Sequence, residues 1–377
     1  MQFIDLKAQQ RALLPQIQER IARVLAHGQY IMGPEVVEME QTLCKRVGVA
    51  HCFSVASGTE ALLMSLMALG IGPGDEVITT PFSFIATAEV IKRVGATPVY
   101  ADIEPDTCNI NVEEIASRIS PRTKAIMPVS LYGQTADMDA LAVLAGQHGI
   151  PVIEDAAQSF GATSNGRASC ALSMLGCTSF FPSKPLGCYG DGGAVFTDDP
   201  QLAGTLRQLR EHGQSARYTH VRVGLGARMD TLQCAIVLAK LERFDWELER
   251  RQTVAAYYEE LLRQAGLAHA VLPVRPRQTS ARAQFTLRIA HRRQIIEALR
   301  SQEIPTAVHY PTPIHRQQAY VEHRARTEYP QADRAAAEVL SLPMHADLQP
   351  ADQERVVDAL ERAYRLALAG DMATDGA

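Results

Sequence analysis

The sequence contains no hydrophobic run that is long enough to cross a bilayer. Its longest mostly apolar stretch, residues 61–72, is about twelve residues long and includes a serine, whereas a membrane-spanning helix needs about 20 apolar residues. The charges of Asp5 and Lys7 come before any hydrophobic run, so no secretory signal peptide is visible. We therefore expect a cytoplasmic protein without a membrane partner.

Closely spaced cysteine pairs are also missing. The seven cysteines are an odd number, they are scattered along the chain, and none of them forms a C-x-x-C motif. Disulfide frameworks and zinc ribbons both need paired cysteines at short spacing. This pattern indicates a reducing compartment and predicts no metal site.

Positive charge is not in excess. The 37 Lys and Arg residues against 42 Asp and Glu residues leave a net charge of −5, and a mildly acidic chain lacks the electrostatic footprint of nucleic-acid binding. Hydrophobic residues at 46% and charged residues at 21% are ordinary for a globular protein. At about 150 residues per domain, a chain of 377 residues predicts one large domain and a smaller one.

Four common catalytic motifs are absent. No G-x-G-x-x-G follows a predicted strand, none of the six lysines is preceded by the glycine of a P-loop, and neither H-E-x-x-H nor G-x-S-x-G occurs. These absences exclude NAD enzymes of the ordinary type, P-loop NTPases, zincins and α/β-hydrolases.

Short apolar runs alternate with segments of helical periodicity between about residues 50 and 200. This alternation predicts parallel strands joined by helical crossovers, and hence an α/β sheet that is covered on both faces. Ligands of such sheets bind at the carboxyl ends of the strands. The predicted strands are residues 51–56, 76–80, 97–103, 124–131, 151–155, 177–181 and 194–197. The predicted helices are residues 60–69, 86–94, 112–119, 138–148 and 200–212.

A long, charge-rich segment of helical periodicity follows at residues 235–264. It predicts a connector that leads from the sheet into a second unit. We expect a large domain at residues 1–245 and a small C-terminal domain at residues 246–377.

The segment Ser57-Gly58-Thr59 ends the first predicted strand and opens a helix. Backbone N–H groups at a helix N-terminus bind phosphate. The glycine lets the backbone approach a ligand closely, and the flanking hydroxyls can add hydrogen bonds. Taken alone, the segment is better explained as a helix N-cap.

Asp155 ends the buried run that begins at Pro151. An acid in such a low-dielectric position needs a charge partner, for which a protonated pyridine nitrogen is one candidate. The alternative is an aspartate that only caps the following helix.

Lys184 follows an aromatic strand, lies between Ser183 and Pro185, and precedes a glycine-rich loop. Burial of an ammonium group there would lower its pKa, and a desolvated lysine can form a Schiff base. The alternative is a lysine at an ordinary surface turn.

Together, the three segments match what pyridoxal 5'-phosphate requires. The helix N-terminus would anchor the phosphate, Lys184 would hold the aldehyde carbon, and Asp155 would keep the ring nitrogen protonated. An aromatic side chain is also needed against the ring, and Phe82 and Phe84 follow a predicted strand. Either of them could instead belong to the core.

At these residues the chain resembles the DegT/DnrJ/EryC1/StrS family of sugar aminotransferases, which are fold type I pyridoxal-phosphate enzymes. The resemblance extends from Phe3 to His345. It implies a large domain with a mostly parallel seven-stranded sheet between helices, and a smaller C-terminal α/β domain. The motifs that carry it are Ser57-Gly58-Thr59, Glu154-Asp-Ala-Ala-Gln158, Ser179–Lys184 and Gly190-Asp-Gly192-Gly193.

The resemblance implies a role for each site residue. Lys184 would form the Schiff base and serve as the catalytic base and acid, and Asp155 would contact the ring nitrogen. Gln158 would approach the ring hydroxyl, and Phe84 would stack on the ring. Family members that act as 3-dehydratases have histidine in place of this lysine, so Lys184 favours amino transfer. The residues expected at the cofactor phosphate are Ser57, Gly58, Thr59 and Ser179.

One segment departs from the family pattern. The family usually has Asn-x-Arg, in which the asparagine reaches the phosphate that is bound in the neighbouring subunit. This chain has Gly226-Ala-Arg228, so that glycine replaces the asparagine while the arginine is retained. The cross-subunit phosphate contact is therefore in doubt.

Within the family, the chain resembles transaminases of UDP-2-acetamido-2-deoxy-3-keto-hexuronic acid, through residues 27–30, 180–190 and 305–311. This implies amino transfer from glutamate to the C3 ketone of the UDP-sugar. The product would be UDP-2-acetamido-3-amino-2,3-dideoxy-glucuronate for O-antigen and lipopolysaccharide synthesis. It also implies a homodimer with active sites at the interface. A uronate carboxylate needs cationic or hydrogen-bonding partners, and the candidates are Arg228, His309 and Tyr310.

Several alternatives stay open. His309 and Tyr310 are equally compatible with packing in the small domain. The substrate could be a dTDP-keto-6-deoxyhexose that lacks a carboxylate. The chain could also be a non-catalytic regulatory protein on the same fold.

Overall fold

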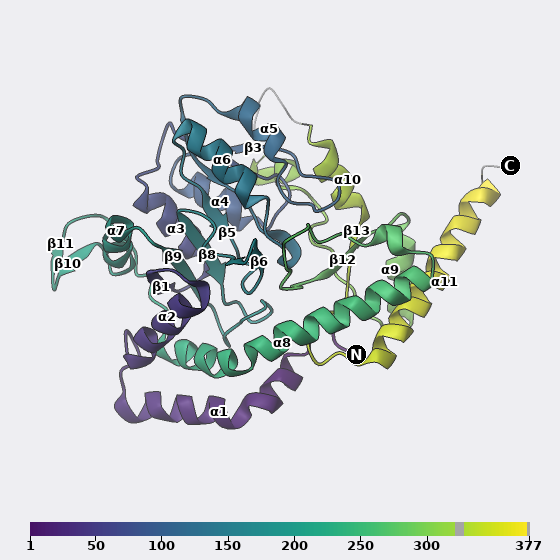
Figure 1. The fold of residues 1–377 in the computed structure, drawn as a ribbon, viewed down its shortest axis with the longest axis horizontal. Helices are drawn as coiled ribbons and strands as arrows, with labels where there is room; N and C mark the ends of the chain where they lie inside the picture. Colours follow the sequence, from purple (N-terminus) through teal and green to yellow (C-terminus); the bar gives the residue numbers. More distant parts are fainter. Residues whose placement is uncertain (321–327, 375–377) are drawn as a thin grey trace.

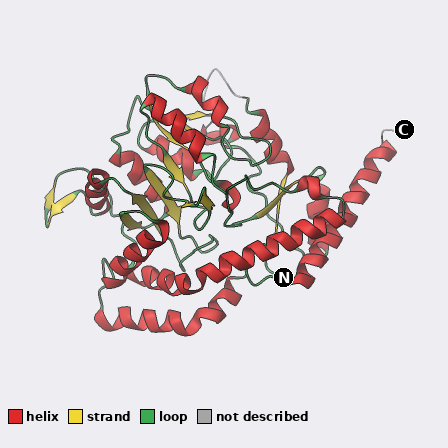
Figure 2. Ribbon diagram, viewed as in Figure 1, coloured by secondary structure: helices red, strands yellow, loops and turns green. Residues whose placement is uncertain are grey.

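A computed structural model describes residues 1–320 and 328–374 of the chain (Figure 1). A central sheet lies between layers of helices, and a second, smaller group of strands and helices lies beside it (Figure 2). Among the described residues, no helix combines the length and the apolar character that crossing a membrane requires.

The central sheet contains seven strands within the described residues, in the order β3-β2-β4-β5-β8-β9-β1. Parallel bridges from Ile126 to Val152 and from Val129 to Asp155 join its two halves. In this sheet β9 runs antiparallel to its neighbours and the other strands are parallel to one another. The mostly parallel seven-stranded sheet of the sequence analysis is therefore confirmed. The strands are β1 His51–Val55, β2 Glu76–Thr79, β3 Thr97–Tyr100, β4 Thr123–Met127, β5 Ile153–Asp155, β8 Leu175–Ser179 and β9 Gly193–Thr197.

Side chains that alternate along each strand build the two faces of this sheet. Val77 and Ile153 join the core beneath α3, α4 and α7, whereas their neighbours Ile78 and Val152 join the core beneath α5 and α6. Both faces are therefore apolar, as a parallel sheet requires. These helices are α3 Gly58–Ala68, α4 Ala86–Arg93, α5 Val112–Ile115, α6 Met138–His148 and α7 Pro200–Arg210.

The predicted strands are confirmed in order, but five of them end earlier than predicted, two of these by three residues or more. The strand predicted at residues 124–131 ends at Met127, because Pro128 has no N–H group for the ladder. The strand predicted at residues 97–103 ends at Tyr100, after which Asp102 turns the chain by accepting a hydrogen bond from the N–H group of Ile103 (2.8 Å). The residues that follow both strands still lie at the same edge of the sheet.

Two helices that the sequence analysis did not predict precede the sheet. α1 (Leu6–His27) and α2 (Pro34–Val47) pack on the long helix α8 (Thr231–Gln264), as Figure 1 shows for α1 and α8. α8 begins four residues before the predicted connector. Its first half lies against the sheet domain and its second half enters the smaller core, so the proposed division at residues 245/246 falls inside one helix.

The smaller core is formed mainly by residues after 254, together with Met1. Its antiparallel pair β12 (Phe285–Arg288) and β13 (Val339–Leu342) packs with α8, α9 (Arg292–Ser301) and α11 (Pro350–Thr374). Two short hairpins are formed by β6 Thr163–Ser164 with β7 Arg167–Ala168 and by β10 Gln214–Ala216 with β11 Thr219–His220. The helix α10 (Pro330–Glu338) buries three alanines in a further core.

Candidate active site

A cavity of about 500 Å³ opens at the carboxyl ends of the sheet strands. It brings together residues from the sheet domain and from the smaller unit, which are far apart in the sequence. Of the predicted site residues, Arg228 does not line this cavity. The predicted residues that line it are Ser57, Gly58, Thr59, Phe84, Asp155, Gln158, Ser179, Lys184, His309 and Tyr310.

The N-terminus of α3 forms one wall of the cavity. The Ser57 hydroxyl caps this helix by accepting a hydrogen bond from the N–H group of Glu60 (3.1 Å). In the described part of the chain, no acceptor pairs with the N–H groups of Gly58 and Thr59. The segment is therefore a helix cap and a set of free donors at once, which is what an anion site at a helix N-terminus needs.

Two glycines allow the backbone to come this close. A Cβ atom on Gly58 would lie 2.7 Å from the Cβ of Ser179, at the end of β8. A Cβ atom on Gly193, at the start of β9, would lie 2.6 Å from the carbonyl carbon of Ser57. The helix N-terminus is thus pressed against two strand ends, and side chains at these positions would push the wall apart.

Asp155 lies at the end of β5 and is buried. Its Oδ2 accepts a hydrogen bond from the Thr87 hydroxyl (2.8 Å), and its Oδ1 accepts one from the N–H group of Ala157 (3.2 Å). Burial raises the pKa of Asp155, and these two hydrogen bonds and the charge of Lys184 oppose the rise. The residue is therefore a carboxyl group in a low-dielectric site, for which a positive partner in the cavity would favour the ionised form.

Lys184 also lines the cavity, and the charge of Asp155 acts on its amine. Burial lowers the pKa of Lys184, and the carboxylate of Asp155 opposes that change. In the described part of the chain, no hydrogen bond or ion pair holds its ammonium group. A lysine at an ordinary surface turn does not fit this position, whereas a desolvated amine with a lowered pKa does.

Gln158 connects the cavity to two tyrosines. Its Oε1 accepts a hydrogen bond from the N–H group of Tyr132 (2.9 Å), and its Nε2 donates to the hydroxyl of Tyr310 (3.1 Å). The hydroxyl of Tyr132 in turn donates to the carbonyl oxygen of His309. Burial raises the pKa of Tyr310, so its hydroxyl keeps its proton. This network fixes His309 and Tyr310 against the sheet domain.

The two candidate aromatic residues have different surroundings. Phe82 is fully buried, in the core of Tyr100 and Val129. Phe84 is 55% exposed, lines the cavity and lies 6.3 Å from Tyr310 between ring centroids. Of the two, Phe84 is therefore the one that a bound ring could contact.

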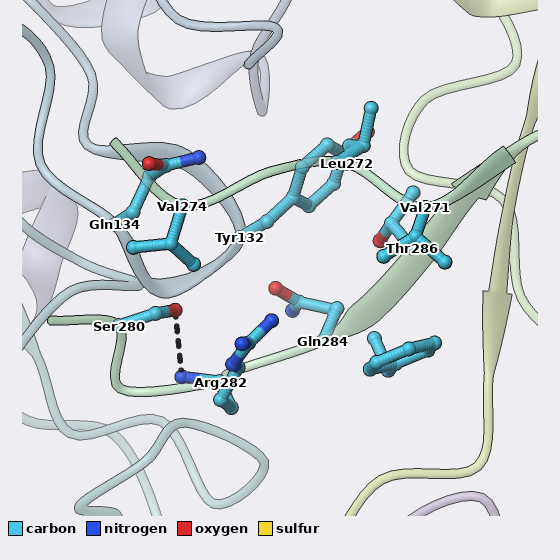
Figure 3. A pocket seen from close by; sticks show the side chains of 10 residues that line it. Tyr132, Gln134, Val271, Leu272, Val274, Ser280, Arg282, Gln284 and Thr286 are labelled. Carbon is cyan, nitrogen blue, oxygen red and sulfur yellow. Dashed lines mark hydrogen bonds between the residues drawn. The ribbon is translucent and has the colours of Figure 1, made fainter. Parts of the chain in front are cut away.

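Several lining residues escaped the sequence analysis. Thr87 has no local signal, because only the packing of α4 against the sheet brings it to Asp155, 68 residues along the chain. Gln284 lines both this cavity and a small one of about 20 Å³ beside it (Figure 3). Its Oε1 is buried without a hydrogen-bond partner among the described residues. The other lining residues that were not predicted include Ser83, Phe181, Ser183 and Asp191.

Gly226 and Arg228 lie on a segment outside the cavity. Gly226 forms an antiparallel bridge with Glu211. A Cβ atom on Gly226 would lie 3.0 Å from Cε1 of His212. The imidazole of His212 thus occupies the space beside Gly226 into which a longer side chain would extend.

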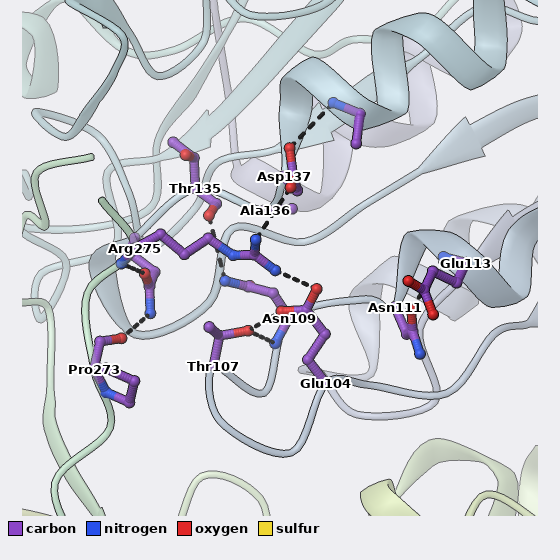
Figure 4. Close-up of polar contacts among 12 residues, drawn as sticks. Glu104, Thr107, Asn109, Asn111, Glu113, Thr135, Ala136, Asp137, Pro273 and Arg275 are labelled. Carbon is purple, nitrogen blue, oxygen red and sulfur yellow. Dashed lines mark hydrogen bonds and ion pairs between the residues drawn. The ribbon is translucent and has the colours of Figure 1, made fainter. Parts of the chain in front are cut away.

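A larger cavity of about 740 Å³ lies elsewhere, between the loop at Glu104 and the segment at Arg275 (Figure 4). Arg275 forms ion pairs there with Glu104 and with Asp137, the latter at 3.1 Å. The charged residues that line this larger cavity are thus partly neutralised within the chain. The cavity of about 500 Å³ contains the unpaired amine of Lys184 and the free N-terminus of α3, so it is the better candidate for an active site.

Comparison with known proteins agrees with this geometry. Residues 12–361 match the family model of DegT/DnrJ/EryC1/StrS aminotransferases. The chain is 52% identical over 360 residues to the UDP-2-acetamido-2-deoxy-3-oxo-D-glucuronate aminotransferase of Pseudomonas aeruginosa, covering 96% of this chain and 99% of that protein.

Solved structures show the same similarity. A crystal structure of a DegT DnrJ EryC1 StrS aminotransferase from Brucella abortus has a TM-score of 0.93 at 40% identity, with 97% of this chain and 99% of that chain covered. NtdA from Bacillus subtilis, solved with the bound cofactor PMP, has a TM-score of 0.90 at 28% identity, with 97% and 85% covered. The chain belongs to the DegT/DnrJ/EryC1/StrS aminotransferase family.

Proposed function

We propose that the chain is a pyridoxal-phosphate-dependent aminotransferase that places an amino group on C3 of a UDP-linked 2-acetamido-3-keto-hexuronic acid. The observation that carries this proposal is the meeting of three groups in one cavity. These are the unpaired amine of Lys184, the buried carboxyl group of Asp155 and the free N-terminus of α3.

The residues present fit pyridoxal phosphate. The free N–H groups of Gly58 and Thr59 suit a phosphate dianion, because the helix dipole adds its positive end there. Ser179 lies directly against Gly58 and supplies a hydroxyl. The similarity to a structure with bound PMP, the pyridoxamine form of the cofactor, supports the same assignment.

When bound, pyridoxal phosphate supplies an aldehyde carbon that can carry an amino group and a ring that can take up negative charge. Asp155 would face the ring nitrogen and keep it protonated, because a positive neighbour stabilises the ionised carboxylate. Phe84 would pack against the face of the ring. Gln158 would hold the ring hydroxyl through its amide group.

Lys184 would act twice in the reaction. Its amine would first bind the aldehyde carbon, and burial favours this by lowering the pKa of the amine. Once the amino donor has displaced it, the same amine would take a proton from the carbon that carries the donor's nitrogen and deliver it to the cofactor carbon on the other side of that nitrogen. Glutamate is the amino donor that we propose, and 2-oxoglutarate would leave.

We also propose that two copies of the chain form a homodimer. The β10–β11 hairpin projects from the sheet domain, as Figure 1 shows. Tyr218, in the turn of the hairpin, is 79% exposed, and Val223, which follows the hairpin, is 87% exposed. Exposed apolar side chains on a projecting arm support a partner surface.

Two observations support a uronate as the acceptor. The relative from Pseudomonas aeruginosa bears the name of such a transaminase. His309 and Tyr310 line the same cavity as Lys184 and Asp155, and both have hydrogen-bonding groups for a carboxylate. Arg228 stays a proposed carboxylate ligand that could act only from outside the cavity of its own chain.

Replacing His309 with glutamine is expected to raise KM for the 3-keto-uronate about tenfold, because a hydrogen bond to a charged group would be lost or weakened. The KM for a 3-keto-sugar without the C6 carboxylate should change less than about threefold. Steady-state assays with glutamate and both sugars, each made in situ from its alcohol, would measure the two effects. His148→Gln, exposed at the end of α6, is the matched control. Equal losses for both sugars, or a wild type that prefers the sugar without a carboxylate, would refute the uronate assignment.

A further inference from the structure

The ring of His309 contacts the hydroxyl of Ser341, which in turn contacts the hydroxyl of Thr286. Thr286 of β12 stands opposite Ser341 of β13 in the antiparallel register. The backbone of Ser341 also exchanges two hydrogen bonds with Ala307, from Ala307 N to Ser341 O (3.1 Å) and from Ser341 N to Ala307 O (2.8 Å). Since His309 follows Ala307 by two residues, its side chain lies on the same side as Ser341.

These three side chains form a continuous chain of hydrogen bonds. The hydroxyl oxygens of Thr286 and Ser341 are 2.9 Å apart, and the Ser341 hydroxyl lies 3.2 Å from Nδ1 of His309. Ser341 is fully buried, so an unmade hydrogen bond of its hydroxyl would be costly. Thr286 is 5% exposed and lines the small cavity of about 20 Å³ (Figure 3).

The direction in which the two hydroxyl groups donate decides which ring nitrogen of His309 carries the proton. A hydroxyl has one hydrogen to donate and lone pairs that accept. In the described part of the chain, Thr286 Oγ1 has no hydrogen-bond partner other than Ser341. If Thr286 donates to Ser341 and Ser341 donates to Nδ1 of His309, both hydroxyl hydrogens are used. In the reverse direction the hydrogen of Thr286 would have no acceptor among these residues.

With Nδ1 accepting, a neutral imidazole carries its proton on Nε2, which is the nitrogen left for the cavity. The lowered pKa of His309, caused first by burial and then by the charge of Lys184, agrees with a neutral ring. A neutral ring in this tautomer presents an N–H donor, whereas the other tautomer would present a lone pair and repel an anion.

We propose that Ser341 is a positioning residue that fixes the Nε2–H tautomer of His309, so that the ring donates a hydrogen bond to the carboxylate of the acceptor sugar. The choice of ligand rests on the proposed function. The tautomer itself follows from the contacts of Thr286, Ser341 and His309 and does not depend on it.

Nuclear magnetic resonance of ¹⁵N-histidine-labelled protein tests the tautomer directly. Long-range ¹H–¹⁵N spectra distinguish the protonated from the unprotonated ring nitrogen, and His309→Gln identifies the signals of His309. The wild type, with and without pyridoxal phosphate, should show a single form with the proton on Nε2. Ser341→Ala should give a mixture of both tautomers, and Ser341→Thr should restore the single form. A wild type with the proton on Nδ1, or an unchanged pattern in Ser341→Ala, overturns the proposal.

Thr286→Val provides a second test if Ser341→Ala does not fold. It removes the hydroxyl that could accept from Ser341, so that Nδ1 of His309 is the remaining acceptor for the Ser341 hydrogen among these residues. We therefore expect Thr286→Val to keep the single Nε2–H form. A proton on Nδ1 in Thr286→Val, or a mixture of both tautomers, would contradict the role of Ser341 as the donor.

Kinetics separate this proposal from the proposed function. Ser341→Ala should raise KM for the 3-keto-uronate about tenfold, change kcat less than about threefold, and leave KM for the sugar without a carboxylate within about threefold. A tautomer change that leaves uronate binding intact would overturn the role of Ser341 in recognition. If the wild type does not accept the uronate at all, the proposed substrate fails. The spectra then still decide whether Ser341 sets the tautomer.

Discussion

Replacing Lys184 with alanine is expected to lower kcat for amino transfer by at least about 10³-fold. Two functions depend on this amine in the proposed reaction, the covalent attachment of pyridoxal phosphate and the transfer of a proton between two carbons. General acid–base catalysis alone contributes about 10²–10⁴-fold. The rate would be measured as 2-oxoglutarate release with glutamate and the 3-keto-uronate.

The fold should survive this substitution, because Lys184 makes no hydrogen bond through its side chain in the described part of the chain. Circular dichroism and the midpoint of thermal unfolding would check this. Lys124→Ala is the matched control, since Lys124 is exposed on β4 and far from the cavity lining. A Lys184→Ala variant that transaminates at nearly the wild-type rate would remove the basis of the proposed mechanism.

Asp155→Asn is expected to lower kcat by about 10²-fold, in the range found when a preorganised electrostatic group is removed from an active site. Asparagine keeps nearly the same size, its amide oxygen can accept from the N–H group of Ala157, and its NH2 group can donate to the Thr87 hydroxyl, which is 2.8 Å from the native carboxylate. It loses the negative charge that would hold a proton on the ring nitrogen. The effect is therefore one of charge and not of packing.

The absorbance of the loaded enzyme between about pH 6 and pH 9 would report the loss of that charge. We expect the pH dependence of the visible band to differ between Asp155→Asn and the wild type. The exposed loop residue Asp106 offers a control, as Asp106→Asn should leave both kcat and the spectrum unchanged. Wild-type turnover in Asp155→Asn would show that the carboxylate does not serve the cofactor.

Much of the sheet domain was predictable from local patterns. The helix Met138–His148 has the predicted bounds, because Asp137 caps its first turn by accepting from the N–H group of Ala140 (3.1 Å). Short apolar runs mark each strand, since both faces of a parallel sheet are buried. The three chemical segments follow strand ends, and parallel strands bring their carboxyl ends to one edge. The cavity lining confirms that Ser57, Asp155 and Lys184 meet there.

Other parts of the site depend on contacts that leave no local mark. The hydroxyl of Thr87 and the amide of Gln284 reach the cavity only through the packing of separate elements. The strands β12 and β13 are four residues long and 50 residues apart in sequence, so alternation alone does not reveal their pairing. Hence the hydroxyl chain behind His309 could not be predicted either.

Arg228 is a residue whose place in the structure does not follow from its sequence motif. The arginine is retained in a familiar pattern, but its segment is bridged to Glu211 and does not line the cavity of its own chain. Its proposed contact with a substrate carboxylate therefore stays a prediction, as does the domain boundary at residues 245/246. The boundary lies within α8, whose continuous hydrogen bonding offers no break there.

Borohydride treatment of the protein loaded with pyridoxal phosphate is the most direct test of the role of Lys184. Reduction would make the bond between the cofactor aldehyde carbon and the enzyme amine permanent, and peptide mass mapping would locate it among the six lysines. The proposed function predicts one equivalent of cofactor on the peptide that contains Lys184, together with loss of the visible band. Attachment to another lysine, or a colourless protein that retains no cofactor, would contradict it and favour the non-catalytic alternative.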